Sequence, residues 1–298
     1  MLTGILAGLA AGALWGLVFV VPRITPGLSA VDLTAGRFIS FGAVAVVAIL
    51  LTLKSAKLPT WNQALMAAGM SILGFSGNYW LLAMSIRDAG SEVPTLIIGT
   101  IPIWMMIWGK PDALRWRALL PGMLLTIIGL VLMTLASLQS FDTVEGDGTF
   151  WRGVGLATLA MAAWTVFGLA NAAWLNRHPE VSASTWTNWL GIATGLGALL
   201  LWLMVGSPAQ ELAVLDNKDW LIFVCVATGI SSAWLATICW NIASQRLSAS
   251  LCGQLIVAET VFGLVYSFWW DQQWPAGLQI AACVLFIAGI LASIRAHT

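Results

Sequence analysis

Long apolar stretches follow one another along the whole chain, and only short polar segments separate them. An α-helix needs about 20 apolar residues to cross the hydrocarbon core of a bilayer. The pattern therefore predicts an all-α integral membrane protein with ten transmembrane helices. We expect these helices over residues 2–21, 31–53, 62–86, 91–109, 118–138, 151–176, 182–205, 219–244, 249–270 and 275–294.

The first five stretches resemble the last five in order and in detail. GILAGLAAGALW at 4–15 matches GVGLATLAMAAW at 153–164, Trp80 matches Trp240, and Gly129 matches Gly289. A repeat with an odd number of crossings places its two copies in opposite orientations. The sequence thus predicts two inverted five-helix repeats around a central cavity: residues 1–138, a linker over 139–150, and residues 151–298.

Composition supports a membrane protein and narrows its partners. The chain is 59% hydrophobic and 9% charged, whereas soluble domains contain about 25% charged residues. A formal net charge of zero argues against a nucleic acid as a partner. The four cysteines lie in apolar stretches without metal-binding spacing, so we expect neither a metal nor a cofactor. The short loops leave no room for a soluble catalytic domain.

Charged residues on alternate loops predict the orientation in the membrane. Lysine and arginine are retained on the cytoplasmic side. Eight of them fall on the side that also holds both ends of the chain, against four on the other side, so both termini should be cytoplasmic. The eight are Lys54, Lys57, Lys110, Arg115, Arg117, Arg177, Arg246 and Arg295; the four are Arg23, Arg87, Arg152 and Lys218.

Two charged residues lie deep inside predicted helices. Glu259 is in the ninth stretch, and a charge at the centre of a membrane helix costs about 3 kcal/mol on insertion scales. It is either a cavity-facing proton or ammonium site or a neutral acid bonded to a neighbouring helix. Arg37 is about two turns into the second stretch, and we favour a structural role, by snorkelling or by pairing with Asp32 or a carbonyl group.

Amides, a phenol and mid-stretch tryptophans are the other candidates. Amide and phenol groups can hold the carboxylate and ammonium of a small zwitterion, although each can equally bond another helix. The tryptophans either pack the bundle or line an aromatic pocket. Gly99 and Pro102 in the fourth stretch form either a hinge or a static kink. The candidate substrate-binding residues are Trp15, Asn78, Tyr79, Trp164, Asn171, Trp240, Asn241 and Gln254.

An ordered set of residues runs through both halves of the chain: Trp15-Gly16, Arg37-Phe38, Tyr79, Ala83, Pro102, Gly122 with Gly129, and Glu259. This set resembles the EamA branch of the drug/metabolite transporter superfamily, and the YddG-type amino-acid exporters most. The resemblance implies a secondary transporter that exports small metabolites from a bacterial-type cell across the inner membrane, with the cavity lined by the third, sixth, eighth and ninth helices. The family often has proline after the acidic residue of the ninth helix, where this chain has Thr260.

Few fixed charges in the membrane favour a zwitterionic or neutral substrate over a phosphate. We expect aromatic and other apolar amino acids first, with a lipophilic cation drug as the alternative. An enzyme is the alternative from another class. GFSG at 74–77 has the GxSG form of a rhomboid-type serine protease, but only His178 and His297 are present to act as a base, and both lie outside the apolar stretches. A channel is a further alternative. Energy coupling and oligomeric state stay open, and a monomer is compatible with the sequence.

Overall fold

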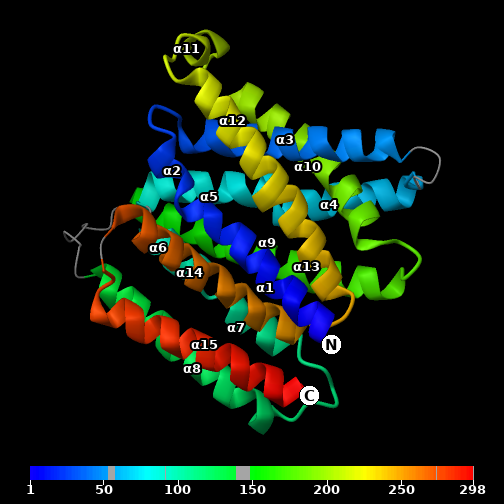
Figure 1. Cartoon of the computed structure of the whole chain (residues 1–298), viewed down its shortest axis with the longest axis vertical. Coiled ribbons are helices and arrows are strands. Elements are labelled where there is room, and N and C mark those ends of the chain that lie inside the picture. The colour runs from blue at the N-terminus through cyan, green and yellow to red at the C-terminus, as the bar shows by residue number, and fades with distance from the viewer. Residues whose placement is uncertain (53–57, 91, 139–147, 273, 298) are drawn as a thin grey trace.

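The computed structural model describes residues 1–52, 58–90, 92–138, 148–272 and 274–297, and within these ranges the regular elements are all helices (Figure 1). Eight helical runs are long and apolar enough to cross a membrane. The expected linker lies largely outside the described residues, because 139–147 are not among them and 148–150 begin a helix. The eight runs are α1 (Leu2–Gly16) with η1 (Leu17–Phe19), α3 (Ala30–Leu51), α8 (Trp116–Leu138), α9 (Gly148–Arg177), α10 (Ala183–Val205), α12 (Lys218–Thr228) with η2 (Gly229–Leu235) and α13 (Ala236–Ser244), α14 (Ala249–Asp271), and α15 (Gly277–His297).

Two of the ten expected helices are each divided in two, so the prediction of ten transmembrane helices is not confirmed. The third becomes α4 (Trp61–Gly74) and α5 (Ser76–Ala89), because Phe75 leaves helical geometry at φ −133° and ψ −94°. The fourth becomes α6 (Glu92–Ile98) and α7 (Ile101–Trp108), separated at Gly99 and Thr100. Two short helices, α2 (Val21–Ile24) and α11 (Ala209–Ala213), lie in connections.

Hydroxyl side chains set where several long helices begin. A serine or threonine before the first turn accepts a hydrogen bond from a backbone N–H that the helix leaves unpaired. Thr60 forms a reciprocal capping box with Gln63 at the start of α4. The other such caps are Ser29 on α3, Ser182 on α10 and Ser248 on α14.

Equivalent helices of the two halves pack antiparallel to each other. In α3 and α10, the Phe38 carbonyl lies beside Gly195, and Ala45 lies beside Gly191. Residue numbers therefore increase in opposite directions along the two helices. Antiparallel packing of equivalent helices is the arrangement that an inverted repeat requires. The same order holds for α8 with α15, through Gly122 with Ser293 and Gly129 with Phe286, and for α7 with α14, through Pro102 with Gly253 and Gly109 with Ser250.

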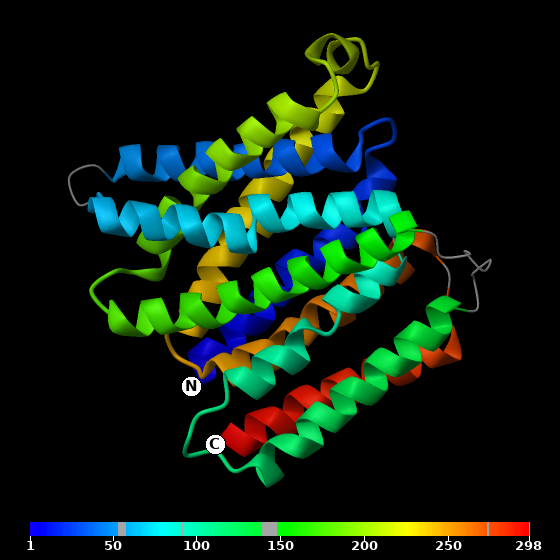
Figure 2. The ribbon, with the colours of Figure 1, turned by 180° about the vertical axis from the view of Figure 1, so that it is seen from behind.

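The remaining contacts are also reciprocal. The first helix of the first half, α1, packs against α13 and α14 of the second half. The first helix of the second half, α9, packs against α5, α6 and α7 of the first half, which occupy the equivalent places. Both ribbon views place the two termini at one end of the bundle (Figures 1 and 2). The two halves therefore meet along a shared central face.

Glycines on α1 allow it to pack closely on the second half. Leu255 would block a Cβ on Gly8, and the Glu259 backbone nitrogen would lie 3.0 Å from a Cβ on Gly12. Such small-residue contacts are the usual way for membrane helices to approach closely. These glycines therefore let α1 lie directly against α14.

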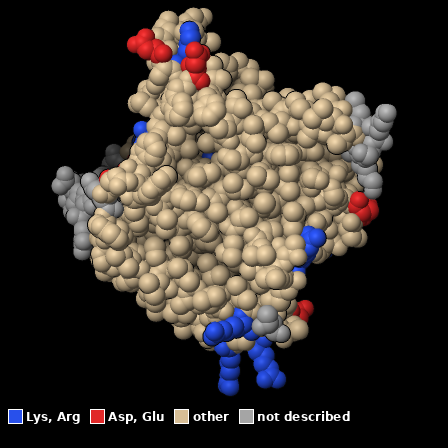
Figure 3. Space-filling model, in the orientation of Figure 1, with Lys and Arg blue, Asp and Glu red and all other residues tan. Residues whose placement is uncertain are grey.

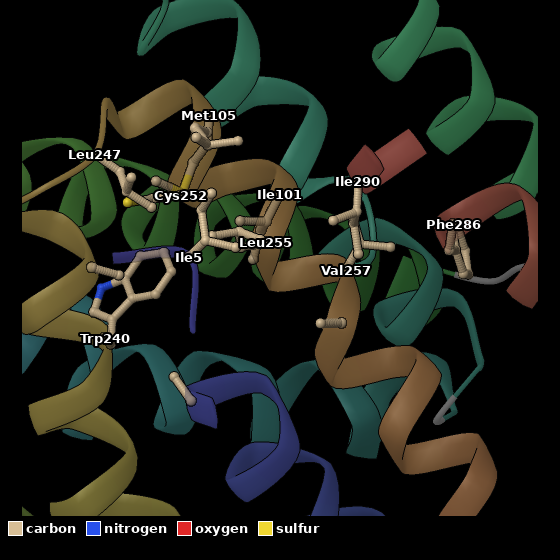
Figure 4. Close-up of a cluster of buried hydrophobic side chains, with 14 of the residues drawn as sticks. Ile5, Ile101, Met105, Trp240, Leu247, Cys252, Leu255, Val257, Phe286 and Ile290 are labelled. Carbon is tan, nitrogen blue, oxygen red and sulfur yellow. The ribbon is translucent and has the colours of Figure 1, made fainter. Parts of the chain in front are cut away.

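A buried apolar cluster lies between α1, α7, α13, α14 and α15 (Figure 4). Ile5, Met105 and Leu247 contribute from the end of the bundle that holds the termini, and the Trp240 ring packs against the same cluster. At the opposite end, two ion pairs join the halves: Arg152 with Asp88 at 2.7 Å and Arg23 with Asp271 at 3.0 Å. The middle of the molecular face in Figure 3 carries few charged side chains, as a lipid-facing surface requires.

Candidate functional site: a central cavity

A cavity of about 620 Å³ lies between the two halves, within the roughly 300–1,000 Å³ typical of small-molecule sites. Helices from both repeats contribute to its lining, including α1, α3 and α5 from the first and α9, α13 and α14 from the second. Eight of the predicted site residues line it: Trp15, Asn78, Tyr79, Gly99, Pro102, Trp164, Trp240 and Glu259.

Asn171 and Asn241 do not line the cavity and instead bond other helices. The Asn171 amide nitrogen donates to the Asn241 carbonyl oxygen at 2.9 Å, and the Trp186 ring nitrogen donates to the Asn171 carbonyl oxygen at 2.7 Å. The Asn241 nitrogen donates to the Thr187 hydroxyl at 2.9 Å. These four residues, which we call the amide network, join α9, α10 and α13.

Gln254 also lies outside the cavity lining. Its nitrogen donates to the Thr126 hydroxyl at 2.8 Å, and its carbonyl oxygen accepts from the Ser293 hydroxyl at 3.1 Å. Gln254 therefore holds α14 against α8 and α15. Each polar group of this fully buried side chain has a protein partner.

Three tryptophans form an aromatic cluster at the cavity wall. The ring centroids of Trp15 and Trp240 are 5.5 Å apart, those of Trp164 and Trp240 are 6.0 Å apart, and those of Trp15 and Trp164 are 6.4 Å apart. These separations fall within the range in which aromatic pairs attract each other. Trp15 and Trp164 occupy equivalent positions in the two repeats, so each repeat contributes the same tryptophan to the cavity wall.

Phenylalanines that sequence reasoning missed extend this wall. Phe167 contacts Trp164 at a centroid distance of 5.8 Å, Phe75 contacts Phe167 at 5.4 Å, and Phe38 contacts Phe75 at 5.9 Å. All three line the cavity. Phenylalanine is common in every apolar helix, so only the tertiary arrangement distinguishes these three from lipid-facing rings.

Asn78 and Tyr79 line the cavity while holding neighbouring segments. The Asn78 nitrogen donates to the Ala160 carbonyl at 2.6 Å and joins α5 to α9. The Tyr79 hydroxyl donates to the Ala30 carbonyl at 3.0 Å. The single donor of Tyr79 and one of the two N–H donors of Asn78 are thus in use. The second N–H of Asn78 and the oxygen lone pairs of both side chains remain for a ligand.

Arg37 and Glu259 are the two charged residues among the described residues that line the cavity. They interact electrostatically, yet they are not among the pairs whose nitrogen and oxygen atoms lie within 4.0 Å of each other in the described structure. The Arg37 Nε is buried without a hydrogen-bond partner, and its guanidinium lies 4.8 Å from the Phe38 ring centroid. Each charge therefore faces the cavity without a directly bonded partner of opposite sign.

The expected pairing of Arg37 with Asp32 is not found. Asp32 accepts hydrogen bonds from the Ser207 backbone nitrogen at 2.9 Å, from the Ser207 hydroxyl at 2.7 Å, and from the Trp202 ring nitrogen at 3.1 Å. Its own helix cap, Ser29, also donates to it. The Asp32 carboxylate thus joins α3 to the end of α10. Arg37 does not pair with it and lines the cavity instead.

Irregular helix geometry occurs where the chain borders the cavity. Phe75, at the break between α4 and α5, lines it, and so do Ser232 and Ala233 of η2, a π-helical segment in the equivalent helix of the second half. π-helical segments are frequent at functional sites because they change the direction of side chains. Thr237, one turn further on, adds a buried hydroxyl that lacks a hydrogen-bond partner in the described structure.

Ser76 of the GFSG motif is not joined to a histidine by any hydrogen bond in the described structure. It begins α5 and lies against Gly197 of α10, on a lateral groove separate from the central cavity. His178 stacks on Trp174 at a centroid distance of 4.4 Å, and the His297 ring bonds the Ser293 carbonyl at 2.7 Å. The nucleophile and base required for a serine protease are therefore not brought together.

Two antiparallel helical repeats around an aromatic-lined cavity define a membrane transporter. The chain belongs to the EamA-like transporter family, whose model matches residues 2–136 and 151–295. It is 30% identical to the inner membrane protein YtfF of Escherichia coli K12 over 99% of this chain and 96% of that protein. A protein of known crystal structure has the same fold, with a TM-score of 0.79, 19% identity, and coverage of 99% of this chain and 96% of that one.

Proposed function

We propose that this protein exports small apolar amino acids, aromatic ones first, across the inner membrane by alternating access. The observation that carries this proposal is the lining of the central cavity: a cluster of three tryptophans with one cationic and one anionic residue. The two charges sum to zero, so the cavity favours a solute without net charge. The aromatic cluster offers an apolar surface on which a ring can stack.

Alternating access requires that the two halves exchange roles, with the site between them. The inverted repeats supply that symmetry. In the described structure, the buried cluster around Ile5, Met105 and Leu247 fills the end that holds the termini. We place both termini in the cytoplasm because lysine and arginine are concentrated in the loops of that end. During export, the substrate would enter the cavity from the cytoplasmic end, which holds the termini, and leave it at the opposite end. We regard Gly99 and Pro102 as the hinge that permits this exchange.

A lipophilic cation is the second candidate substrate, and Glu259 is the observation that favours it. A carboxylate beside tryptophan rings suits a cation through charge and cation–π attraction. Arg37 in the same cavity opposes such a ligand, because it would face a second positive charge. We therefore rank the amino acid first.

Uptake of radiolabelled phenylalanine into sealed proteoliposomes at equal pH on both sides tests the proposal, with protein-free liposomes as the control. We expect saturable uptake that unlabelled tryptophan inhibits and a lipophilic cation such as tetraphenylphosphonium does not. Inhibition by the cation alone would favour the drug-export alternative. Flux that does not saturate would indicate a channel, and flux equal to that of empty liposomes would contradict amino-acid transport.

A further inference from the structure

The two charged residues of the cavity face it from different halves of the protein. Arg37 comes from α3 of the first repeat and Glu259 from α14 of the second. The two charges attract each other through space. Neither residue has a hydrogen bond or an ion pair to another side chain in the described structure. A charge held in a low-dielectric site without such a partner is costly, which marks it as a functional group.

Two residues of the cavity lining have backbone carbonyl oxygens that lack their helical donors. Pro102 has no N–H to donate to the Ile98 carbonyl, and the Ile103 N–H donates to Thr100 at 2.9 Å rather than to Gly99. The break between α6 and α7 therefore leaves the carbonyl oxygens of Ile98 and Gly99 without their helical donors. Both of these residues line the cavity.

The internal repeat relates this break to Glu259. The spacing that aligns Trp80 with Trp240, and Gly129 with Gly289, also aligns Gly99 with Glu259. Equivalent positions of the two repeats thus hold oxygen acceptors in cavity-lining residues, as backbone carbonyls in one half and as a carboxylate in the other. A primary ammonium group carries three N–H donors and no acceptor, so it suits such a set of oxygens.

We propose that Arg37 and Glu259 bind the two charged ends of one zwitterion. Arg37 receives the substrate carboxylate, for which its planar guanidinium offers paired N–H donors. Glu259, with the Ile98 and Gly99 carbonyls, receives the ammonium group. This inference rests on the proposed function and deepens it: the substrate must carry a free carboxylate and a free amine, close enough to bridge the two residues. In the presence of substrate, each cavity charge then has a partner.

Binding of three related compounds to the purified full-length protein tests this assignment by calorimetry. L-Phenylalanine carries both charges, L-phenylalaninamide lacks the carboxylate, and 3-phenylpropionate lacks the amine. A hydrogen bond to a charged group corresponds to about tenfold to a hundredfold in affinity. We expect wild type to bind phenylalanine at least about tenfold more tightly than either analogue.

Variants then assign each end of the ligand. Arg37→Gln should weaken phenylalanine binding by about tenfold or more while leaving phenylalaninamide within about threefold, and Arg37→Lys should retain part of the affinity. Glu259→Gln should weaken phenylalanine binding by a similar factor while leaving 3-phenylpropionate nearly unchanged. Arg246→Gln and Glu211→Gln, at exposed positions outside the cavity, are the matched controls and should bind like wild type.

The outcomes separate this inference from the proposed function. If wild type binds phenylalanine but Arg37→Gln binds it equally well, or weakens all three compounds alike, the assignment of Arg37 is overturned while amino-acid binding stands. If wild type binds none of the three compounds, both the proposed function and this inference are wrong. If Arg37→Gln does not fold, the ranking of the three compounds on wild type decides: equal affinities overturn the zwitterion assignment, and a clear preference for phenylalanine supports it.

Discussion

The amide network and the cavity charges are both polar groups inside the helical bundle, yet they are arranged in opposite ways. In the amide network, Asn171 accepts from Trp186 and donates to Asn241, which donates in turn to Thr187. Arg37 and Glu259 have no such bonds in the described structure and face a cavity of about 620 Å³. Polarity alone therefore does not distinguish these two groups, whereas their hydrogen-bond partners and their access to the cavity do.

The largest expected effect is on transport and comes from Glu259. Glu259→Gln keeps the shape of the side chain and removes its charge. We expect phenylalanine uptake per folded protein to fall by about tenfold to a hundredfold, because a charge-assisted bond to the substrate is lost. The melting temperature should stay the same or rise, since a buried charge is removed. Proteoliposome uptake and a thermal unfolding scan of the same preparation measure both quantities.

The matched control for this variant is Glu211→Gln on α11, an exposed position far along the chain from the cavity residues. It should transport like wild type. If Glu259→Gln transported normally and unfolded at a lower temperature, Glu259 would belong with the structural polar groups and the comparison would fail.

The second effect is on stability and comes from Asn171. Asn171→Ala leaves the Trp186 ring nitrogen without its acceptor and the Asn241 carbonyl oxygen without its donor. We expect a loss of about 1–3 kcal/mol in the free energy of unfolding. Uptake per folded protein should stay within about twofold of wild type, because the residues of the network lie outside the cavity lining. A selective loss of phenylalanine binding at unchanged stability would show that the network serves the site directly.

The third effect is on apparent affinity and comes from the aromatic cluster. Trp164→Leu keeps an apolar side chain and removes the ring that lies within 6.4 Å of both Trp15 and Trp240. An aromatic contact contributes about 0.5–1.5 kcal/mol beyond area burial, which is about twofold to tenfold in affinity. We expect the KM for phenylalanine to rise by this factor while the KM for leucine changes less. Equal changes for both substrates would indicate a packing role for Trp164.

The sequence predicted the architecture because membrane crossing depends on the local run of apolar residues. The two breaks differ in this respect. Pro102 indicates the interruption after α6, because proline cannot donate to the preceding turn. Phe75 carries no such signal, and the break there depends on how α4 and α5 pack in the assembled bundle. Hydropathy therefore placed the third expected helix correctly and missed its division.

The candidate site was harder to predict, because a helix brings polar residues to every face and only packing decides which face meets the cavity. Asn78 and Asn171 are the same residue in similar apolar helices, yet Asn78 lines the cavity and Asn171 lies in the amide network. Proximity in sequence was misleading for Arg37. Asp32 is its nearest acidic neighbour, but Ser207, remote in sequence, occupies that carboxylate.

The smallest effect is expected outside the membrane, at the ion pair between Asp88 and Arg152. The Arg152 guanidinium holds the pKa of Asp88 below its usual value of 3.8. A carboxyl group with a lowered pKa stabilises the folded state above the unfolded pKa, and this contribution is lost as the pH falls through the folded pKa. The Asp88 side chain is only 4% exposed, but that of Arg152 is 56% exposed, and an ion pair with a solvated partner contributes little.

Asp88→Asn should therefore lower the melting temperature only slightly at pH 7. The difference from wild type should begin to shrink near pH 3.8 and disappear once the pH is below the lowered pKa of Asp88 in the folded protein. Transport should be unchanged. Thermal unfolding scans of both proteins across this pH range measure the difference. A large loss at pH 7 would show that this connection between α5 and α9 stabilises the protein more than an ion pair with a solvated arginine normally does.

The central claim is that one alternating cavity carries an amino acid across the membrane, and counterflow tests it most directly. Proteoliposomes are preloaded with unlabelled phenylalanine, and the entry of radiolabelled tryptophan is followed. An alternating-access carrier returns faster when loaded, so preloading should accelerate tryptophan entry several-fold over vesicles preloaded with buffer. Entry that is unaffected by preloading, or equal to that of protein-free liposomes, would contradict the account.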